Sequence, residues 1–169
     1  FTTPSKMYAL VGSYSVESVL AKARASLGSA DPAVEMPVAS DLSKLCVWRP
    51  RGADVPDRFA WLMGTGVYRG AFNFNASESS RVLERHGALP FPRLEGDESG
   101  TEVPISLTMT EYHILLLYTK YLVAMNAVTG EIEATIELPK GGASTFVFTD
   151  PVTGAVYVAN VGNMLEVTL

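Results

Sequence analysis

Residues Thr110–Leu138, TEYHILLLYTKYLVAMNAVTGEIEATIEL, contain a continuous apolar segment, a second apolar segment, a turn and an alternating segment. In Glu131–Leu138 apolar and polar residues alternate, which predicts a strand with one face on a core and the other in water. His113–Tyr118 (HILLLY) has no polar side and predicts a strand that is covered on both faces. A buried strand followed by a half-exposed antiparallel hairpin is typical of a β-propeller blade read from inside to outside.

Composition is consistent with a globular domain and argues against several function classes. The chain has 169 residues, is 47% hydrophobic and carries a net charge of −5 without a run of Lys and Arg. Electrostatic capture of nucleic acid or of an anionic membrane is therefore not expected. The single Cys46 cannot form an internal disulfide and suits a reducing compartment. No apolar run is long enough to predict a transmembrane segment.

The rest of the chain predicts short strands and one helix, so the fold class is all-β. The helix is expected at Ser15–Leu27, with Ser15 as its cap and Gly28 as its end. The range Asn75–Gly100 is polar and rich in turn residues, which predicts a variable loop. Further strands are predicted at Leu42–Trp48, Phe59–Met63, Val67–Phe74 and Val103–Met109.

Two similar turns punctuate the C-terminal part. Asn126-Ala-Val-Thr-Gly130-Glu131 is echoed by Asp150-Pro-Val-Thr-Gly154-Ala155. Asn or Asp begins such turns by bonding the backbone, and Gly supplies a positive φ. Both segments are therefore predicted hairpin tips, with Gly130 and Gly154 in the left-handed region.

Candidate chemistry is sparse along the chain. Gly64-x-Gly66-x-x-x-Gly70 lacks the spacing and the following helix of a phosphate loop, so these glycines are expected to serve a hairpin. His86 is placed in the polar loop and His113 at the start of a buried strand, and neither has a second ligand at metal spacing. The sequence thus predicts no catalytic residue, no metal and no cofactor.

Other polar features favour structural or solvated roles. Glu95, Asp97, Glu98 and Glu102 lack the regular spacing of a calcium loop and are expected to be a solvated acidic loop. No Gly-x-Ser-x-Gly elbow is present. Asn75-Ala76-Ser77 is a formal glycosylation sequon that the reducing compartment would leave unused. Trp48 and Trp61 are expected to pack in the core.

Three ordered blocks resemble a known family. They are Phe1–Gly12 (FTTPSKMYALVG), Phe59–Gly70 (FAWLMGTGVYRG) and Pro104–Tyr118 (PISLTMTEYHILLLY). Together they resemble the later part of the N-terminal propeller in the vacuolar protein sorting-associated protein 18 (Deep orange) family. The resemblance implies a seven-bladed propeller, of which residues 1–169 would supply roughly the last three to four blades. It also implies that earlier blades precede Phe1 and that the family's solenoid and RING zinc site lie elsewhere, because no Cys-x-x-Cys occurs here.

The resemblance also implies a function and a location. The family is expected to act as a non-catalytic recognition scaffold in the HOPS and CORVET membrane-tethering complexes, with the other subunits and membrane-associated fusion factors as partners. The protein would then be cytoplasmic and peripheral on late endosome and vacuole (lysosome) membranes. Which residues contact partners is not indicated, although Asp97 and Glu98 could serve docking. The alternative is a propeller enzyme or small-ligand binder that uses the central channel, for which HILLLY offers mainly aliphatic side chains.

Overall fold

The computed structural model describes residues 6–7, 34–35, 44–49, 57–62, 66–72, 83–94, 102–139, 146–160 and 162–169. Every regular element within these ranges is a β-strand, so the all-β prediction is confirmed. The predicted helix Ser15–Leu27 lies outside the described residues. The predicted strands Leu42–Trp48, Phe59–Met63, Val67–Phe74 and Val103–Met109 overlap with strands of the structure.

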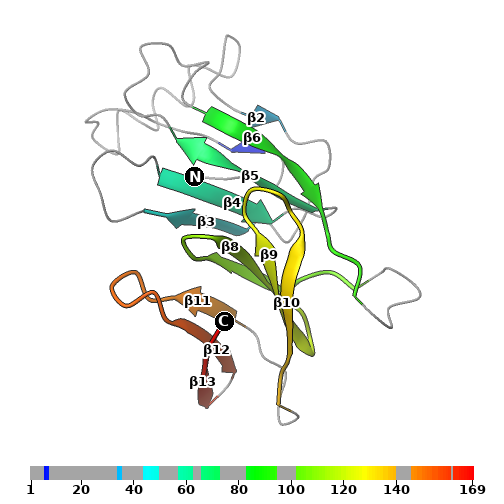
Figure 1. The fold of residues 1–169 in the computed structure, drawn as a ribbon, viewed down its shortest axis with the longest axis vertical. Helices are drawn as coiled ribbons and strands as arrows, with labels where there is room; N and C mark the ends of the chain where they lie inside the picture. The colour runs from blue at the N-terminus through cyan, green and yellow to red at the C-terminus, as the bar shows by residue number, and fades with distance from the viewer. Residues whose placement is uncertain are drawn as a thin grey trace.

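The described strands form antiparallel sheets whose strands follow one another in chain order. A short pair, β1 (Lys6–Met7) and β2 (Val34–Glu35), accompanies three larger sheets, which lie one after another along the long axis in Figure 1. The first sheet contains β3 (Lys44–Trp48), β4 (Asp57–Leu62), β5 (Gly66–Phe72) and β6 (Leu83–Pro90). The second contains β7 (Ser106–Met109), β8 (His113–Leu117), β9 (Tyr121–Asn126) and β10 (Ile132–Glu137). The third contains β11 (Phe146–Thr149), β12 (Val156–Asn160) and β13 (Asn163–Val167).

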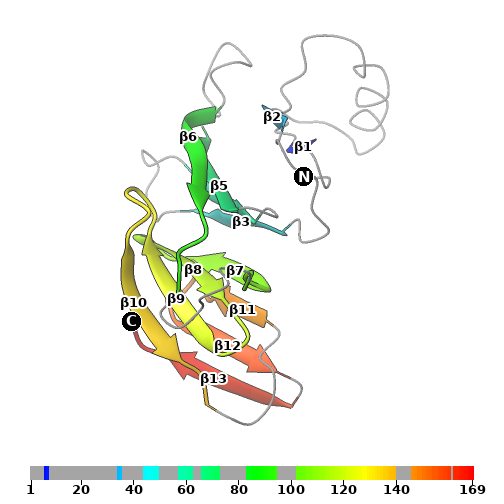
Figure 2. The same cartoon turned by 90° about the vertical axis from the view of Figure 1, so that its right-hand side faces the viewer.

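The first strands of the three sheets meet, as the inner strands of a propeller do. Strand β7 packs against both β3 and β11, and Figure 2 shows β7 next to β11. The hydroxyl of Thr108 lies 3.0 Å from the hydroxyl of Thr149 and 3.9 Å from the thiol of Cys46, so one polar row joins all three strands. The innermost strand of the second sheet is therefore β7, and the expectation that HILLLY is innermost is wrong. HILLLY forms the second strand, β8.

Strand β8 is the centre of the apolar core. Ile114 and Leu116 pack in the cluster shared with the first sheet, and Leu115 and Leu117 pack in the cluster shared with the third sheet. All four side chains are fully buried. Because the two faces of the strand face two different sheets, both need apolar residues, and the prediction of a strand covered on both faces is confirmed.

Strand β10 follows the predicted alternation only in part. Ala134 and Ile136 are half-buried and Leu138 is buried, whereas Ile132 is 43% exposed. The strand is the outermost of its sheet, and its pairing with β9 shifts register between Ile132 and Ala134. An irregularity of this kind re-aims a side chain at a sheet edge, which explains the exposed Ile132.

The prediction of a loop throughout Asn75–Gly100 is wrong, because β6 lies inside it. Residues Leu83–Pro90 pair antiparallel with β5 and complete the first sheet. The sequence of β6 is polar because it is an outer strand with several exposed residues, so its pairing with β5, and not its own apolar pattern, makes it a strand. His86 therefore belongs to a strand rather than to a loop, and its Nδ1 hydrogen-bonds the hydroxyl of Tyr68.

Both predicted hairpin tips are confirmed. Gly130 has φ 80° and Gly154 has φ 79°. The side-chain oxygen of Asn126 accepts hydrogen bonds from the amides of Val128 and Thr129, and that of Asp150 accepts one from the amide of Val152. The turns lie between β9 and β10 and between β11 and β12.

Candidate functional site: an arginine-lined groove between the first two sheets

Turns of the second sheet lie against the first sheet at one end of the strands. The β7–β8 and β9–β10 turns leave the second sheet at the same end, because successive strands run in opposite directions, and the amide of Ala127 donates to the carbonyl of Tyr112 between them. The guanidinium of Arg58, near the start of β4, donates to the carbonyl of Glu111 over 2.7 Å. This contact joins the first sheet to the β7–β8 turn.

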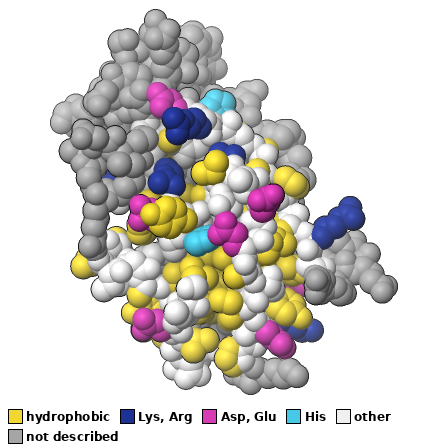
Figure 3. Space-filling model, in the orientation of Figure 1, with side chains coloured by type: hydrophobic (Ala, Val, Ile, Leu, Met, Phe, Trp, Pro, Cys, Tyr) yellow, Lys and Arg dark blue, Asp and Glu magenta, His cyan; other side chains and the backbone are white. Residues whose placement is uncertain are grey.

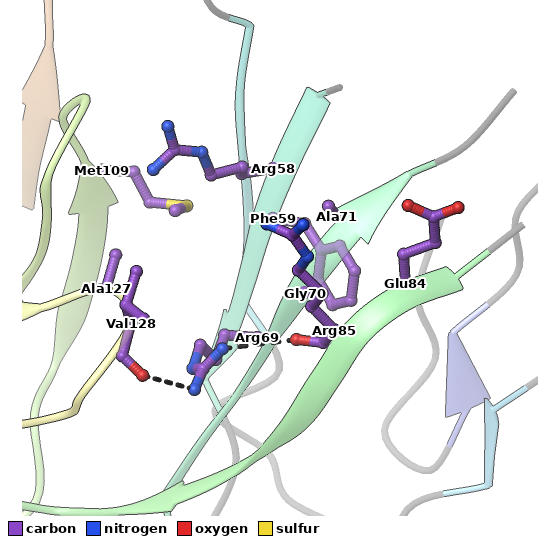
Figure 4. A pocket seen from close by; sticks show the side chains of 10 residues that line it. All are labelled: Arg58, Phe59, Arg69, Gly70, Ala71, Glu84, Arg85, Met109, Ala127 and Val128. Carbon is purple, nitrogen blue, oxygen red and sulfur yellow. Dashed lines mark hydrogen bonds between the residues drawn. The ribbon is translucent and has the colours of Figure 1, made fainter. Parts of the chain in front are cut away.

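A groove of about 690 Å³ opens at this junction. Its lining combines three arginines and one glutamate with apolar side chains, and Figure 4 shows these residues around the opening. The charged residues come from β4, β5 and β6, while Met109, Ala127 and Val128 come from the second sheet. The lining residues are Arg58, Phe59, Arg69, Gly70, Ala71, Glu84, Arg85, Met109, Ala127 and Val128.

Arg69 bridges the two walls of the groove. Its Nη2 donates to the carbonyl of Val128 over 2.6 Å and its Nη1 donates to the carbonyl of Arg85 over 3.3 Å, the two dashed lines of Figure 4. A guanidinium presents several donors in a rigid plane, which suits it to hold two backbone segments at once. Arg69 is thus a positioning residue, whereas the exposed Arg85 has its side chain available to an occupant.

Backbone irregularity in β6 places Arg85 at the groove. Pairing between β5 and β6 shifts register between Arg69 and Ala71, and Arg85 has φ 49°. A non-glycine residue in the left-handed region is uncommon and costs on the order of 1–2 kcal/mol. Gly70 of β5 lies at the same register shift, and a Cβ on it would be 2.8 Å from the Phe59 ring and from the Cβ of His86. The floor of the groove therefore requires glycine at position 70.

The groove is positively charged in a chain whose net charge is negative. Among the residues that the structure describes, none of the three guanidinium groups is paired with a carboxylate, and Arg58 and Arg69 donate to neutral carbonyls instead. In a partly desolvated groove, unneutralised guanidinium groups favour binding of an anion. Chemically, the site can bind carboxylate or phosphate oxygens beside apolar groups.

An apolar side chain lies at the outer rim of the groove. Val128, which lines the groove, is 68% exposed. The face drawn in Figure 3 shows basic side chains close to hydrophobic ones. Exposed apolar residues beside arginines are the composition of a protein-binding surface.

A polar cluster braces the second sheet near the same turns. His113 Nε2 lies 2.6 Å from a carboxylate oxygen of Glu133, whose other oxygen accepts a hydrogen bond from the amide of Asn126 over 2.7 Å. The hydroxyl of Thr110 lies 3.3 Å from His113 Nδ1 and accepts a hydrogen bond from the His113 backbone amide. A hydroxyl, an imidazole and a carboxylate in this order occur in hydrolases. Here, however, the contacts of Glu133 join β10 to β8 and β9, and the contacts between Thr110 and His113 lie within the tight β7–β8 turn. Bracing the hairpins is the role that the geometry supports.

The hydrogen bonds from Asn126 and His113 lower the pKa of the Glu133 carboxyl. Elsewhere, burial raises the pKa of the Cys46 thiol and of the Tyr68 phenol. Both groups therefore stay neutral at physiological pH, and Cys46 is not an activated nucleophile.

The inner strand is more polar than HILLLY led us to expect. Ser106 and Thr108 of β7 are buried, and the hydroxyl of Ser106 accepts a hydrogen bond from the amide of Val147 in β11. These hydroxyls are used between sheets, so they hold the seam.

The structure does not bring the other candidate residues together into a site. Gly66 and Gly70 lie in β5, and a Cβ on Gly66 would clash with the carbonyl oxygen of Leu89, so Gly66 serves strand packing. Trp61 is buried, as predicted, and Trp48 is half-buried against the core. Glu102 is half-buried. Gly64, the sequon at Asn75-Ala76-Ser77 and the acidic residues Glu95, Asp97 and Glu98 lie outside the described residues.

The arginines were missed because they are scattered in sequence. Arg58, Arg69 and Arg85 lie on three strands, and only the pairing of β4, β5 and β6 brings them together. The available signal was an arginine within each of three segments that otherwise expose few charges. It becomes informative only when Leu83–Pro90 is recognised as a strand.

Within the described ranges there is no helix long and apolar enough to cross a membrane. The same ranges contain no group of three or more His, Cys, Asp or Glu that could hold a metal ion.

Comparison with known proteins gives the family. The Pep3/Vps18/deep orange beta-propeller domain matches residues 1–169. Vacuolar sorting protein 18 of Arabidopsis thaliana is 31% identical over 137 residues, which are 77% of this chain and 13% of the plant protein. The Vacuolar protein sorting-associated protein 18 homologs of Drosophila melanogaster and Danio rerio are each 26% identical over 125 residues, covering 70% and 73% of this chain and 12% of each homolog.

The chain thus spans about an eighth of the length of the curated relatives that it matches. The family match covers all three sheets, including β8 and the two hairpin tips. The chain belongs to the Pep3/Vps18/deep orange β-propeller domain family.

Proposed function

We propose that the chain is the recognition propeller of a vacuolar sorting subunit, and that it acts without catalysis in the HOPS and CORVET membrane-tethering complexes. The observation that carries the proposal is the family match over the whole chain, together with relatives named vacuolar sorting proteins in a plant, a fly and a fish. The expected location is the cytoplasmic side of late endosomes and vacuoles.

The mechanism is geometric. A rigid β scaffold holds hairpin tips at fixed positions, and partners bind those tips or the groove between them. Support for rigidity comes from β8, whose two faces are buried in two separate clusters. Support for recognition comes from exposed apolar residues at the tips, Val128 and Val152, which are 68% and 69% exposed.

The test is complementation of vacuole fusion in cells that lack the subunit. Three full-length versions are compared: the intact protein, one without this propeller, and one with Leu116→Asp, which places a charge in the core. The proposal expects the propeller deletion to reduce fusion while the other subunits still co-purify. Undiminished fusion and normal localisation of the complex without the propeller would refute the recognition role.

A further inference from the structure

We propose that the groove between the first two sheets binds an acidic, partly apolar segment of a partner protein. Carboxylates of that segment pair with Arg58 and Arg85, and its apolar side chains pack on the exposed Val128. The inference rests on the proposed recognition function and names the kind of partner that the propeller receives.

Charge complementarity argues for an acidic occupant. Arg58 and Arg85 reach the groove without a carboxylate partner among the described residues, and a guanidinium binds a carboxylate through two parallel hydrogen bonds. Glu84 is the one acidic lining residue, so the arginines outnumber it. Clustered arginines are a recurring means of recognising acidic motifs.

The size and the lining of the groove argue for a peptide segment rather than a folded surface. A volume of about 690 Å³ lies within the usual range for small ligand sites and admits only a few side chains. Phe59, Met109 and Val128 supply apolar walls next to the charges. An extended segment with acidic and apolar residues satisfies both kinds of lining.

A membrane surface is a poorer match. Binding to anionic lipid depends on a broad group of basic residues, whereas here three arginines gather at one groove of about 690 Å³ in a chain of net charge −5. A lipid headgroup would also leave the exposed apolar side chain of Val128 without a matching partner.

The groove is also held in shape before any partner arrives. Arg69 ties Arg85 to Val128, and Arg58 is tied to Glu111, so the two walls are linked by hydrogen bonds across the sheets. Preorganisation of this kind lowers the entropy cost of binding. The left-handed Arg85 is strain of the sort that gathers at binding sites.

The experiment measures binding of a fluorescent peptide to the full-length protein by anisotropy. The probe is a short peptide in which glutamate alternates with leucine, and a second peptide carries glutamine in place of glutamate. We expect the acidic peptide to bind, with affinity falling as salt rises, and the glutamine peptide to bind at least about tenfold more weakly.

Two variants remove the proposed contacts and a third serves as control. Arg85→Gln and Arg58→Gln should each weaken the acidic peptide by about tenfold, which corresponds to roughly 1.4 kcal/mol. Arg93→Gln removes an exposed arginine that does not line the groove and should leave the affinity unchanged. Arg69 is not substituted, because it holds the walls together. Arg58→Gln also removes the hydrogen bond to the carbonyl of Glu111, so Arg85→Gln is the substitution that tests carboxylate pairing alone. Thermal unfolding of each variant checks that the protein remains folded.

The inference is overturned if the intact protein binds neither peptide, if both peptides bind equally, or if Arg93→Gln weakens binding as much as Arg85→Gln. Vesicles containing phosphatidylserine are tested in parallel, and vesicle binding that requires Arg85 without peptide binding would overturn it in favour of a lipid surface. Co-purification of the other subunits is followed in every variant. Intact co-purification and propeller-dependent fusion with no peptide binding would remove this inference alone and leave the proposed function standing.

Discussion

Alanine substitution at two equivalent hairpin glycines separates backbone strain from a contact between sheets. Gly130 and Gly154 have φ 80° and 79°, so an L-residue at either site adopts the left-handed region at a cost of about 1–2 kcal/mol. Their surroundings differ. A Cβ on Gly130 would lie 2.8 Å from Cδ2 of Leu89 at the end of β6, whereas a Cβ on Gly154 meets nothing within 4 Å.

We therefore expect Gly154→Ala to lower the local stability of its hairpin by the strain alone. Gly130→Ala should cost the same strain plus the displacement of Leu89, an added penalty of about 1 kcal/mol, because overpacking forces neighbours off their positions. Gly87→Ala is the control: its backbone is not left-handed and nothing lies within 4 Å of the added Cβ. That change should be neutral or slightly stabilising.

The assay is native-state hydrogen exchange in the full-length protein, read at the amides of β9–β10 and of β11–β12. Local opening free energies follow from the protection factors, about tenfold for each 1.4 kcal/mol. Leu89→Ala added to Gly130→Ala should recover the steric part, which makes a double-substitution cycle. Equal costs at positions 130 and 154, or no recovery with Leu89→Ala, would show that Leu89 does not restrict the turn.

Three further predictions concern the core, the polar brace and the third sheet. Leu116→Asp buries an unpaired charge between two sheets and should prevent stable folding, measured as loss of soluble protein and of exchange protection, while Val152→Asp at an exposed tip should leave both unchanged. The pKa of Glu133 is lowered in the folded state, so the carboxylate stabilises the fold above the ordinary carboxyl pKa. That contribution is lost as the pH falls through the pKa that Glu133 has in the folded protein. Glu133→Gln should therefore flatten the acid dependence of hydrogen exchange in β10, and an unchanged dependence on pH would exclude the brace. Residues 1–169 expressed alone should self-associate through the aromatic face at Phe146, which is 52% exposed. Light scattering should then detect oligomers, and Phe146→Ser should reduce their amount. A monodisperse monomer would contradict this prediction.

Local chemistry explains why much of the fold could be predicted from the sequence. The apolar run of β8 is buried on both faces, and such a run has few other stable placements. Asn126 and Gly130 determine their turn through contacts within a few residues, so the hairpin could be read without knowing what packs around it.

The errors came where distant parts of the chain decide the outcome. Strand β6 is polar, and its strand conformation comes from pairing with β5 rather than from its own pattern. The order of strands from the inner edge depends on how three sheets meet at β3, β7 and β11, which no local periodicity encodes. The arginine groove could not be predicted for the same reason. Its arginines are brought together by the pairing of three strands, and its apolar wall comes from a different sheet.

Because the groove has walls from two sheets, its shape depends on the seam that joins them. Arg58 and Arg69 hold that seam through carbonyl groups, and Leu89 meets the Gly130 turn at the same junction. A change at Gly130 should therefore weaken peptide binding although position 130 does not line the groove. Gly154→Ala carries similar backbone strain in a turn that makes no such contact, so it should leave peptide affinity intact. If both substitutions weakened binding equally, the effect would come from general loss of stability, and the groove would not depend on this seam.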